Sequence, residues 1–169
     1  MNGHRDKMPV ELTVNGRRFR TTVESRRLLS DVLRHDLRLT GTHVGCEQGA
    51  CGSCTVLLDG EPVRSCLMFA VQCSGMTLTT IEGLAPEGTL HPLQHAFMQR
   101  HGLQCGFCTP GMITRAYRLL QENPNPSEAD IRQGISGNLC RCTGYLTIVR
   151  AIRAAAEQIS NAREARNDD

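Results

Sequence analysis

The chain has 169 residues, which is enough for one ordinary domain or two small ones. Its 19 basic and 17 acidic residues are mixed along the sequence, the net charge is +2, and no basic stripe indicates a nucleic-acid partner. Residues 1–7 are polar and lack the apolar core of a signal peptide, and no apolar run approaches the ~20 residues that span a bilayer. We therefore expect a cytoplasmic protein without a transmembrane segment, in which grouped, reduced cysteines favour metal binding over disulfides.

The first half of the chain has the pattern of a small α+β domain. Apolar and polar residues alternate on both sides of Asn15-Gly16, and strand-like segments flank Asp59-Gly60; both dipeptides are typical of tight hairpin turns. Apolar residues at helical spacing predict a helix over 28–37, and the segment 76–81 is a further strand candidate. Two hairpins, one helix and a closing strand together predict the α+β class.

Helical periodicity takes over after Gly83. Apolar faces predict four helices, near 90–98, 109–123, 127–135 and 148–159. Gly102 is expected to end the first helix, and Thr109 is expected to cap the second. Ser127 and Asp130 resemble a capping pair for the third. The second half is therefore expected to be an all-α four-helix bundle.

These patterns divide the chain into two expected domains. The first covers 9–82 and the second covers 83–160, and the Gly- and Pro-containing segment 82–90 is the expected linker. Residues 1–8 and 161–169 are polar or charged and are expected to be tails.

Eight of the nine cysteines fall into two compact sets. The first set is spaced C-x4-C-x2-C-x11-C and consists of Cys46, Cys51, Cys54 and Cys66. The second set is spaced C-x2-C-x31-C-x-C and consists of Cys105, Cys108, Cys140 and Cys142. Four thiolates are what a 2Fe-2S cluster needs, so two such sets in one small chain indicate electron transfer through two clusters.

The first set lies in a glycine-rich loop. Cys46, Cys51 and Cys54 occur within nine residues, and the glycines between them allow the positive φ angles that a close wrap requires. Backbone N–H groups in such a loop point inward and bind anions, and a 2Fe-2S cluster with four thiolates is an anion. The spacing is that of plant-type ferredoxins. A structural zinc site is the alternative, although zinc sites usually pair short C-x2-4-C knuckles.

The second set lies at two expected helix starts. Cys105 and Cys108 precede one helix, and Cys140 and Cys142 precede the last one. The partial positive charge of helix N-termini suits an anionic cluster. Taken alone, this spacing is only moderately specific, and zinc is again the alternative.

Taken together, the two sets resemble the iron–sulfur small subunit of the molybdenum hydroxylases, the xanthine oxidase family. The matching segments are Gly45–Cys54, Cys66, Gln104–Gly111 and Ser136–Tyr145, and the resemblance covers about 9–160. It implies a ferredoxin-like β-grasp domain followed by a four-helix domain with the second cluster. Ser136 and Leu146 depart from the common family residues, but neither departure removes a cysteine. The chain's end soon after the helical region resembles the separate-subunit form of the family.

The resemblance also implies partners and roles. Single electrons would pass from a molybdenum-pterin cofactor on a large subunit through the second cluster and then the first, usually to FAD on a medium subunit, in an assembly such as a dimer of heterotrimers. Gln104 would hydrogen-bond the pterin, and Cys142 would lie next to it. The chain would belong to an oxidoreductase but carry no substrate chemistry itself, and it indicates neither the substrate nor the final acceptor.

Two other functions are kept as alternatives: a zinc-stabilised interaction module, and a free ferredoxin-like carrier. The ninth cysteine, Cys73, is expected to be a small core residue rather than a reactive thiol. His91 and His95 are expected to be surface residues, since both cysteine sets are complete without them. The remaining large side chains of the second half are expected in the bundle core: Phe97, Met98 and Met112.

Overall fold

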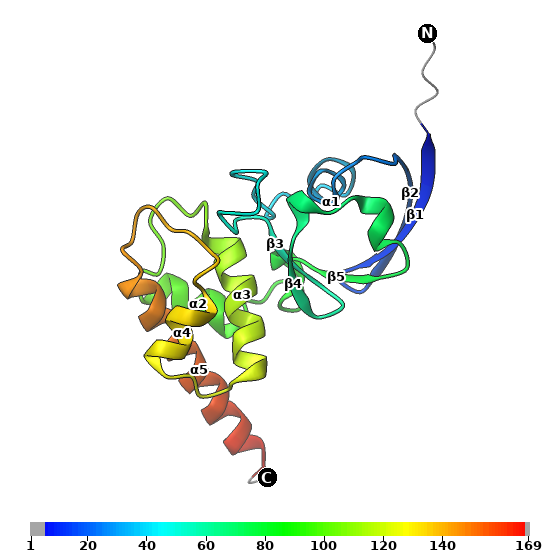
Figure 1. The fold of residues 1–169 in the computed structure, drawn as a ribbon. Helices are drawn as coiled ribbons and strands as arrows, with labels where there is room; N and C mark the ends of the chain where they lie inside the picture. The colour runs from blue at the N-terminus through cyan, green and yellow to red at the C-terminus, as the bar shows by residue number, and fades with distance from the viewer. Residues whose placement is uncertain (1–5, 168–169) are drawn as a thin grey trace.

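The computed structural model describes residues 6–167, so the outer parts of the two expected tails, 1–5 and 168–169, lie outside the described residues. Figure 1 shows two halves side by side, a strand-rich N-terminal half and a helical C-terminal half. None of the helices in the described part of the chain is long and apolar enough to cross a membrane.

One mixed five-stranded sheet organises the first half. Its strands are β1 (Lys7–Val14), β2 (Arg17–Glu24), β3 (Thr55–Leu58), β4 (Glu61–Arg64) and β5 (Thr77–Thr79), in the order β2-β1-β5-β3-β4. β1 and β5 are parallel, and the other neighbours are antiparallel. With the helices of the second half, this sheet confirms the predicted α+β class.

Both predicted hairpins are confirmed. Asn15 and Gly16 have φ angles of 51° and 76°, and Asp59 and Gly60 have φ angles of 47° and 86°. Two consecutive positive φ angles define the type I′ turn, whose twist matches that of the paired strands. The first strand begins at Lys7, inside the segment that was expected to be a tail, because its pairing with β2 continues to that residue.

The helix predicted over 28–37 is a short α-turn, α1 (Leu29–Asp31), followed by a wider π-helical segment, η1 (Val32–Asp36). Leu29, Val32 and Leu33 are fully buried against the sheet. Short 3-10 segments follow later in the chain: η2 (Ser65–Leu67), η3 (Ala70–Cys73) and η4 (Ile81–Gly83). Cys73 is fully buried in the same core, which confirms its expected structural role.

Four α-helices make up the second half: α2 (Pro92–Gln99), α3 (Thr109–Glu122), α4 (Glu128–Gly134) and α5 (Leu146–Asn167). They share one core, whose largest fully buried side chains are Phe97, Leu93, Met112, Ile131, Ile135, Ile148 and Ile152. The predicted capping pair of α4 is confirmed, since Ser127 accepts from the Asp130 backbone N–H at 3.2 Å.

Several helical details differ from the sequence prediction. α2 ends before Gly102, because His101 already takes a left-handed φ of 53°. Met98 is 60% exposed, so its assignment to the core was wrong. The cap of α3 is Cys108, and Thr109 is the first helical residue. α5 continues to Asn167 instead of ending near 159.

The two halves meet where α3 lies against the β3–β4 hairpin (Figure 1). Arg64 spans the junction, donating to Thr55 Oγ1 at 2.7 Å and to the Gly137 carbonyl at 2.6 Å. Arg118 of α3 pairs with Glu61 at 2.6 Å. Gly111 allows the close approach, because a Cβ there would lie only 2.9 Å from the Ser53 carbonyl oxygen.

Gly111→Ala should therefore destabilise the protein, although alanine normally favours a helix by about 1 kcal/mol over glycine. The added methyl group would meet backbone carbonyls of the facing loop, which cannot move as a side chain can, and we expect a loss of about 1–3 kcal/mol in the free energy of unfolding. Chemical denaturation measures this change in the free energy of unfolding. Gly134→Ala is the matched control, since its methyl group would meet only the end of the Leu119 side chain. Equal midpoints for the two variants would contradict the steric argument.

Candidate metal centres

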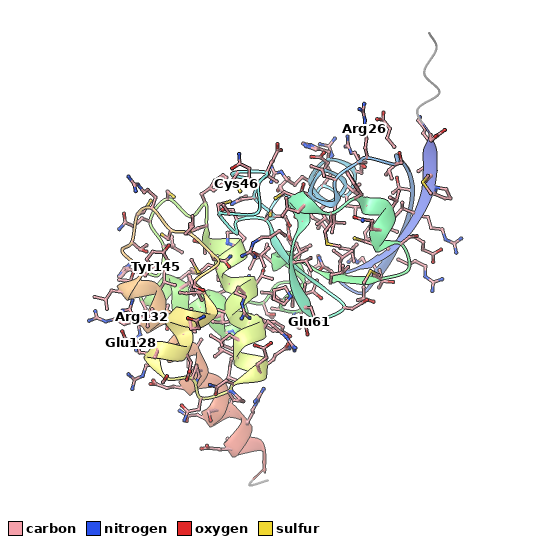
Figure 2. All side chains as sticks on the ribbon, in the orientation of Figure 1. Arg26, Cys46, Glu61, Glu128, Arg132 and Tyr145 are labelled. Carbon is pink, nitrogen blue, oxygen red and sulfur yellow. The ribbon has the colours of Figure 1, made fainter. Side chains whose placement is uncertain are left out.

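The first cysteine set is held between the loop before β3 and the segment after β4. Cys54 and Cys66 are buried, whereas Cys46 and Cys51 are partly exposed. Ser65 ties the two buried members together, because its backbone N–H and its hydroxyl both donate to the Cys54 carbonyl, at 3.3 and 2.8 Å. Figure 2 labels Cys46 on the loop near the junction of the two halves.

This loop directs backbone donors at a sulfur, as the sequence predicted. The N–H groups of Cys51 and Gln48 donate to Cys46 Sγ at 3.4 and 3.5 Å. Positive φ angles at Glu47 (52°) and Gly49 (77°) give the loop the tight path that this needs. These backbone hydrogen bonds, that of Cys51 first, lower the pKa of Cys46 to about 6. The loop is therefore built to stabilise negative charge on sulfur.

Cys66, on the other side of this site, is harder to ionise than Cys46. Burial, together with the neighbouring thiol of Cys54 and the charge of Cys46, raises the pKa of Cys66 to about 11. Sulfurs that oppose one another's ionisation in this way lie close together. A bound cation would relieve the repulsion, because metal binding favours the deprotonated thiolate.

The second set lies at the surface of the helical half. Cys108 caps α3, while Cys140 and Cys142 lie in the loop before α5. The sulfurs of Cys142 and Cys105 are 3.5 Å apart, and both residues are exposed. Burial, together with the hydrogen bond to the Cys140 thiol and the charges of Cys140 and Cys105, raises the pKa of Cys108 to about 12.

Cys140 receives donors from its own loop. Burial alone would raise its pKa, but the Thr143 hydroxyl, 3.1 Å from Sγ, together with backbone N–H groups, outweighs burial and lowers the pKa. A further hydroxyl, Thr109 Oγ1, is buried beside Cys108 with no partner among the described residues. An unpartnered hydroxyl on the residue after Cys108 could donate a hydrogen bond to an anionic cluster.

The structure thus brings the thiols together within each set and not between the sets, since the sulfur neighbours of Cys46 and Cys66 belong to the first set and those of Cys108 and Cys142 to the second. In the described part of the chain, no three His, Cys, Asp or Glu side chains form a site for a single metal ion. Ligation by the eight cysteines stays a prediction, and the donor set fits an anionic cluster. His95 is exposed, as predicted, whereas His91 is only partly exposed: its Nδ1 accepts from the Leu93 N–H at 3.2 Å, and burial lowers its pKa.

The two cysteine loops touch directly. The Leu139 N–H donates to the Cys51 carbonyl at 2.8 Å. Asn138, 1% exposed, donates from Nδ2 to the Gly52 carbonyl at 2.9 Å and to Thr55 Oγ1 at 3.2 Å. A Cβ at Gly52 would lie 2.5 Å from the Gly137 carbonyl oxygen, so only glycine fits there.

A second contact closes the junction on its other side. His43 stacks on the ring of Phe107, with ring centroids 4.9 Å apart, and its Nδ1 lies 2.8 Å from the Phe107 carbonyl oxygen. Phe107 lies between Cys105 and Cys108, so this contact joins the first-set side of the molecule to the second-set loop. Asn138 and His43 were not found from the sequence, because their role depends on a partner in the other half.

Comparison with known proteins decides the family. Residues 12–75 match the family "2Fe-2S iron-sulfur cluster binding domain", and residues 80–153 match the family "[2Fe-2S] binding domain". The chain is 55% identical to caffeine dehydrogenase subunit gamma of Pseudomonas sp. (strain CBB1), over 87% of this chain and 90% of that one. It is 50% identical to the nicotine 6-hydroxylase small subunit of Paenarthrobacter nicotinovorans, over 92% and 94%. The chain belongs to the iron–sulfur small subunits of the molybdenum hydroxylases.

Solved structures agree with this assignment. A chain of quinoline 2-oxidoreductase from Pseudomonas putida 86 superimposes with a TM-score of 0.88 at 51% identity, over 92% of this subunit and 97% of that chain. Aldehyde oxidoreductase from Desulfovibrio gigas superimposes with a TM-score of 0.86 at 46% identity, but this subunit covers only 17% of that longer chain. The subunit is thus an iron–sulfur component of an oxidoreductase, as its sequence predicted.

Asn138→Ala tests the junction between the cysteine loops of this small subunit. The change removes two buried hydrogen bonds and leaves the Thr55 hydroxyl and the Gly52 carbonyl with one partner fewer, so we expect a loss of about 1–3 kcal/mol in the free energy of unfolding. Hydrogen exchange at the Leu139 amide should also become faster. Exposed Asn125→Ala is the control and should change neither quantity. Unchanged exchange at Leu139 in the Asn138 variant would show that this side chain does not hold the junction.

Proposed function

We propose that this subunit holds two 2Fe-2S clusters and relays single electrons from a molybdenum-pterin subunit towards an FAD subunit. The first set would ligate one cluster and the second set the other. When bound, such a cluster takes up and releases one electron at a time. The hydrogen bond from the Leu139 N–H to the Cys51 carbonyl carries the proposal, because it joins the two sets by their own backbones.

The electron path that this hydrogen bond offers between the two cysteine sets is short. Cys51 belongs to the first set, and Leu139 is covalently bonded to Cys140 of the second. Only covalent bonds and one 2.8 Å hydrogen bond therefore separate a sulfur of one set from a sulfur of the other. The Asn138, Arg64 and Gly52 contacts hold this bond in place, which favours a fixed distance between the two centres.

The two ends of the proposed relay differ in exposure. Cys105 and Cys142 are exposed, and so are Gln104 next to Cys105 and the apolar Leu139, at 53%. An exposed sulfur pair beside apolar surface suits a covering subunit. We propose that this face meets the molybdenum subunit, where Gln104 would hydrogen-bond the pterin and Cys142 would lie next to it. These relatives are named as a small subunit and a subunit gamma, which supports an assembly with other chains.

The end at the first set is also bordered by apolar surface. Leu67, next to buried Cys66, is 56% exposed, and Phe69 is 43% exposed. This face would meet the electron acceptor, and the family resemblance favours a medium FAD subunit in a dimer of heterotrimers.

We also propose a division into two domains, a ferredoxin-like β-grasp domain over 9–82 and a four-helix domain over 83–160. Two separate buried cores support it. One is built around the sheet, from residues such as Leu12 and Leu78, and the other lies between the helices, from residues such as Phe97 and Ile152. Leu84, just after the proposed boundary, already belongs to the helical core.

Metal analysis of the purified complex tests the proposed function. Two clusters require about four iron atoms and about four acid-labile sulfides per chain, whereas two four-thiolate zinc sites would give about two zinc ions and no sulfide. A red-brown colour and two distinct signals in electron paramagnetic resonance are expected. Zinc in place of iron would establish the interaction module instead, and elution of the small subunit alone, with iron, would establish a free carrier.

Cys142→Ser should block or slow electron transfer from the molybdenum subunit, because a poorer ligand would replace the thiolate at the exposed end of the relay. Rapid mixing with reducing substrate, followed by the rate of cluster reduction, measures the effect. Cys73→Ala is the matched control, since Cys73 lies in the core of the first half and outside both sets. Wild-type reduction rates in the Cys142 variant would refute its place at the entry.

A further inference from the structure

The loop that carries Cys140 closes on itself through three hydrogen bonds. Thr143 Oγ1 lies 3.1 Å from Cys140 Sγ. The Tyr145 backbone N–H donates to the same Thr143 oxygen at 3.1 Å, and the Cys140 backbone N–H donates to the Tyr145 hydroxyl at 2.9 Å. Tyr145, labelled in Figure 2 on the helical half, has a left-handed φ of 69°, which its side-chain anchor helps to hold.

If Cys140 ligates a metal, these contacts decide which atom donates the hydrogen bond between Thr143 and Cys140. Its oxygen accepts the Tyr145 N–H, so one lone pair is occupied. A cysteine that ligates a metal is a thiolate and can only accept hydrogen bonds. The Thr143 hydrogen must therefore point at Cys140 Sγ. A hydrogen bond to an ionised sulfur is charge-assisted and stronger than one between neutral groups.

We propose that Thr143 raises the reduction potential of the cluster held by the second cysteine set, by donating its hydroxyl hydrogen bond to Cys140 Sγ. The inference rests on the proposed cluster ligation. An oxidised 2Fe-2S cluster with four thiolates carries a net charge of −2, and one electron makes it −3 as one ferric iron becomes ferrous. The electron comes from the molybdenum subunit in the proposed relay. Because the sulfurs become more negative, a donor stabilises the reduced form more than the oxidised form.

Thr143 is a positioning residue in this scheme, since it acts on the iron only through Cys140. It differs from the donors of the first set, which are backbone N–H groups of Cys51 and Gln48 that no side-chain substitution removes. Thr143 is therefore a point at which one side chain can change the potential of one centre and leave the other unchanged.

The test is a redox titration of the whole complex, followed by electron paramagnetic resonance, for Thr143→Val and Thr143→Ser. Valine keeps the shape but loses the hydroxyl, and we expect the affinity of the second-set cluster for an electron to fall roughly threefold to tenfold, or about 28–59 mV for a one-electron couple. Serine keeps the hydroxyl and should restore the wild-type potential. The second-set signal is identified as the one that changes in Cys142→Ser.

Thr89→Val is the matched control, because Thr89 is exposed and donates to the Pro86 carbonyl at 2.7 Å, outside both cysteine loops. It should leave both potentials unchanged. If Thr143→Val fails to load iron, Thr143→Ala provides the same loss of the hydroxyl with a smaller side chain. Two intact signals with wild-type potentials in the hydroxyl-free variant would overturn the inference. Failure to find two signals in the wild type would instead overturn the proposed function.

Discussion

Both cysteine loops are shaped by the need to hold negative charge on closely packed sulfur atoms. Each cysteine set pairs a sulfur whose pKa burial raises with a sulfur whose pKa hydrogen-bond donors lower: Cys66 with Cys46 in the first set, and Cys108 with Cys140 in the second. One thiol of each pair therefore ionises easily, whereas the other favours its protonated form unless a cation binds. The cysteine loops follow tight paths around these sulfurs, with positive φ angles at Glu47, Gly49, Gly52, Gly106, Gly144 and Tyr145. Metal binding as proposed would also contribute to folding, since the packed thiols would repel one another once they were ionised.

The same loops form part of the contact between the two halves, beside the packing of α3 on the β3–β4 hairpin. Gly52 follows Cys51, Asn138 comes two residues before Cys140, and both lie in the junction. A shift of one half against the other would therefore disturb both cysteine sets at once. Arg64 reinforces the contact by binding groups on both sides of it, Thr55 Oγ1 and the Gly137 carbonyl. Because these hydrogen bonds join groups of the two halves, the separation of the two sets is coupled to the stability of the whole chain.

Features encoded by local sequence could be predicted, and features that depend on the other half could not. The Asn15-Gly16 and Asp59-Gly60 turns are local signals, and so both hairpins were predicted correctly, whereas ligation by the two cysteine sets stays a prediction. The side chain of Met98 shares its turn with core residues, but it faces outward, which a helical period alone does not show. The last turns of α5 are rich in charged residues, which by composition alone resemble a tail. Pairs such as Arg153–Glu157 nevertheless support an exposed helix. Asn138 has no local signal at all, because its partners lie more than eighty residues away.

The difference in exposure between the two sets gives the proposed relay a direction. In the first set Cys54 and Cys66 are buried and Cys46 and Cys51 are partly exposed, so this set is less exposed than the second. Cys105 and Cys142 are exposed, and a partner that covers them would remove water from the second set. Electrostatic interactions strengthen when water is excluded, so the hydrogen bond from Thr143 to Cys140 would count for more in the complex than in the free subunit. The Thr143 oxygen already lies 3.1 Å from the Cys140 sulfur in this subunit, so assembly would increase the effect of the proposed hydrogen bond without rearranging the loop.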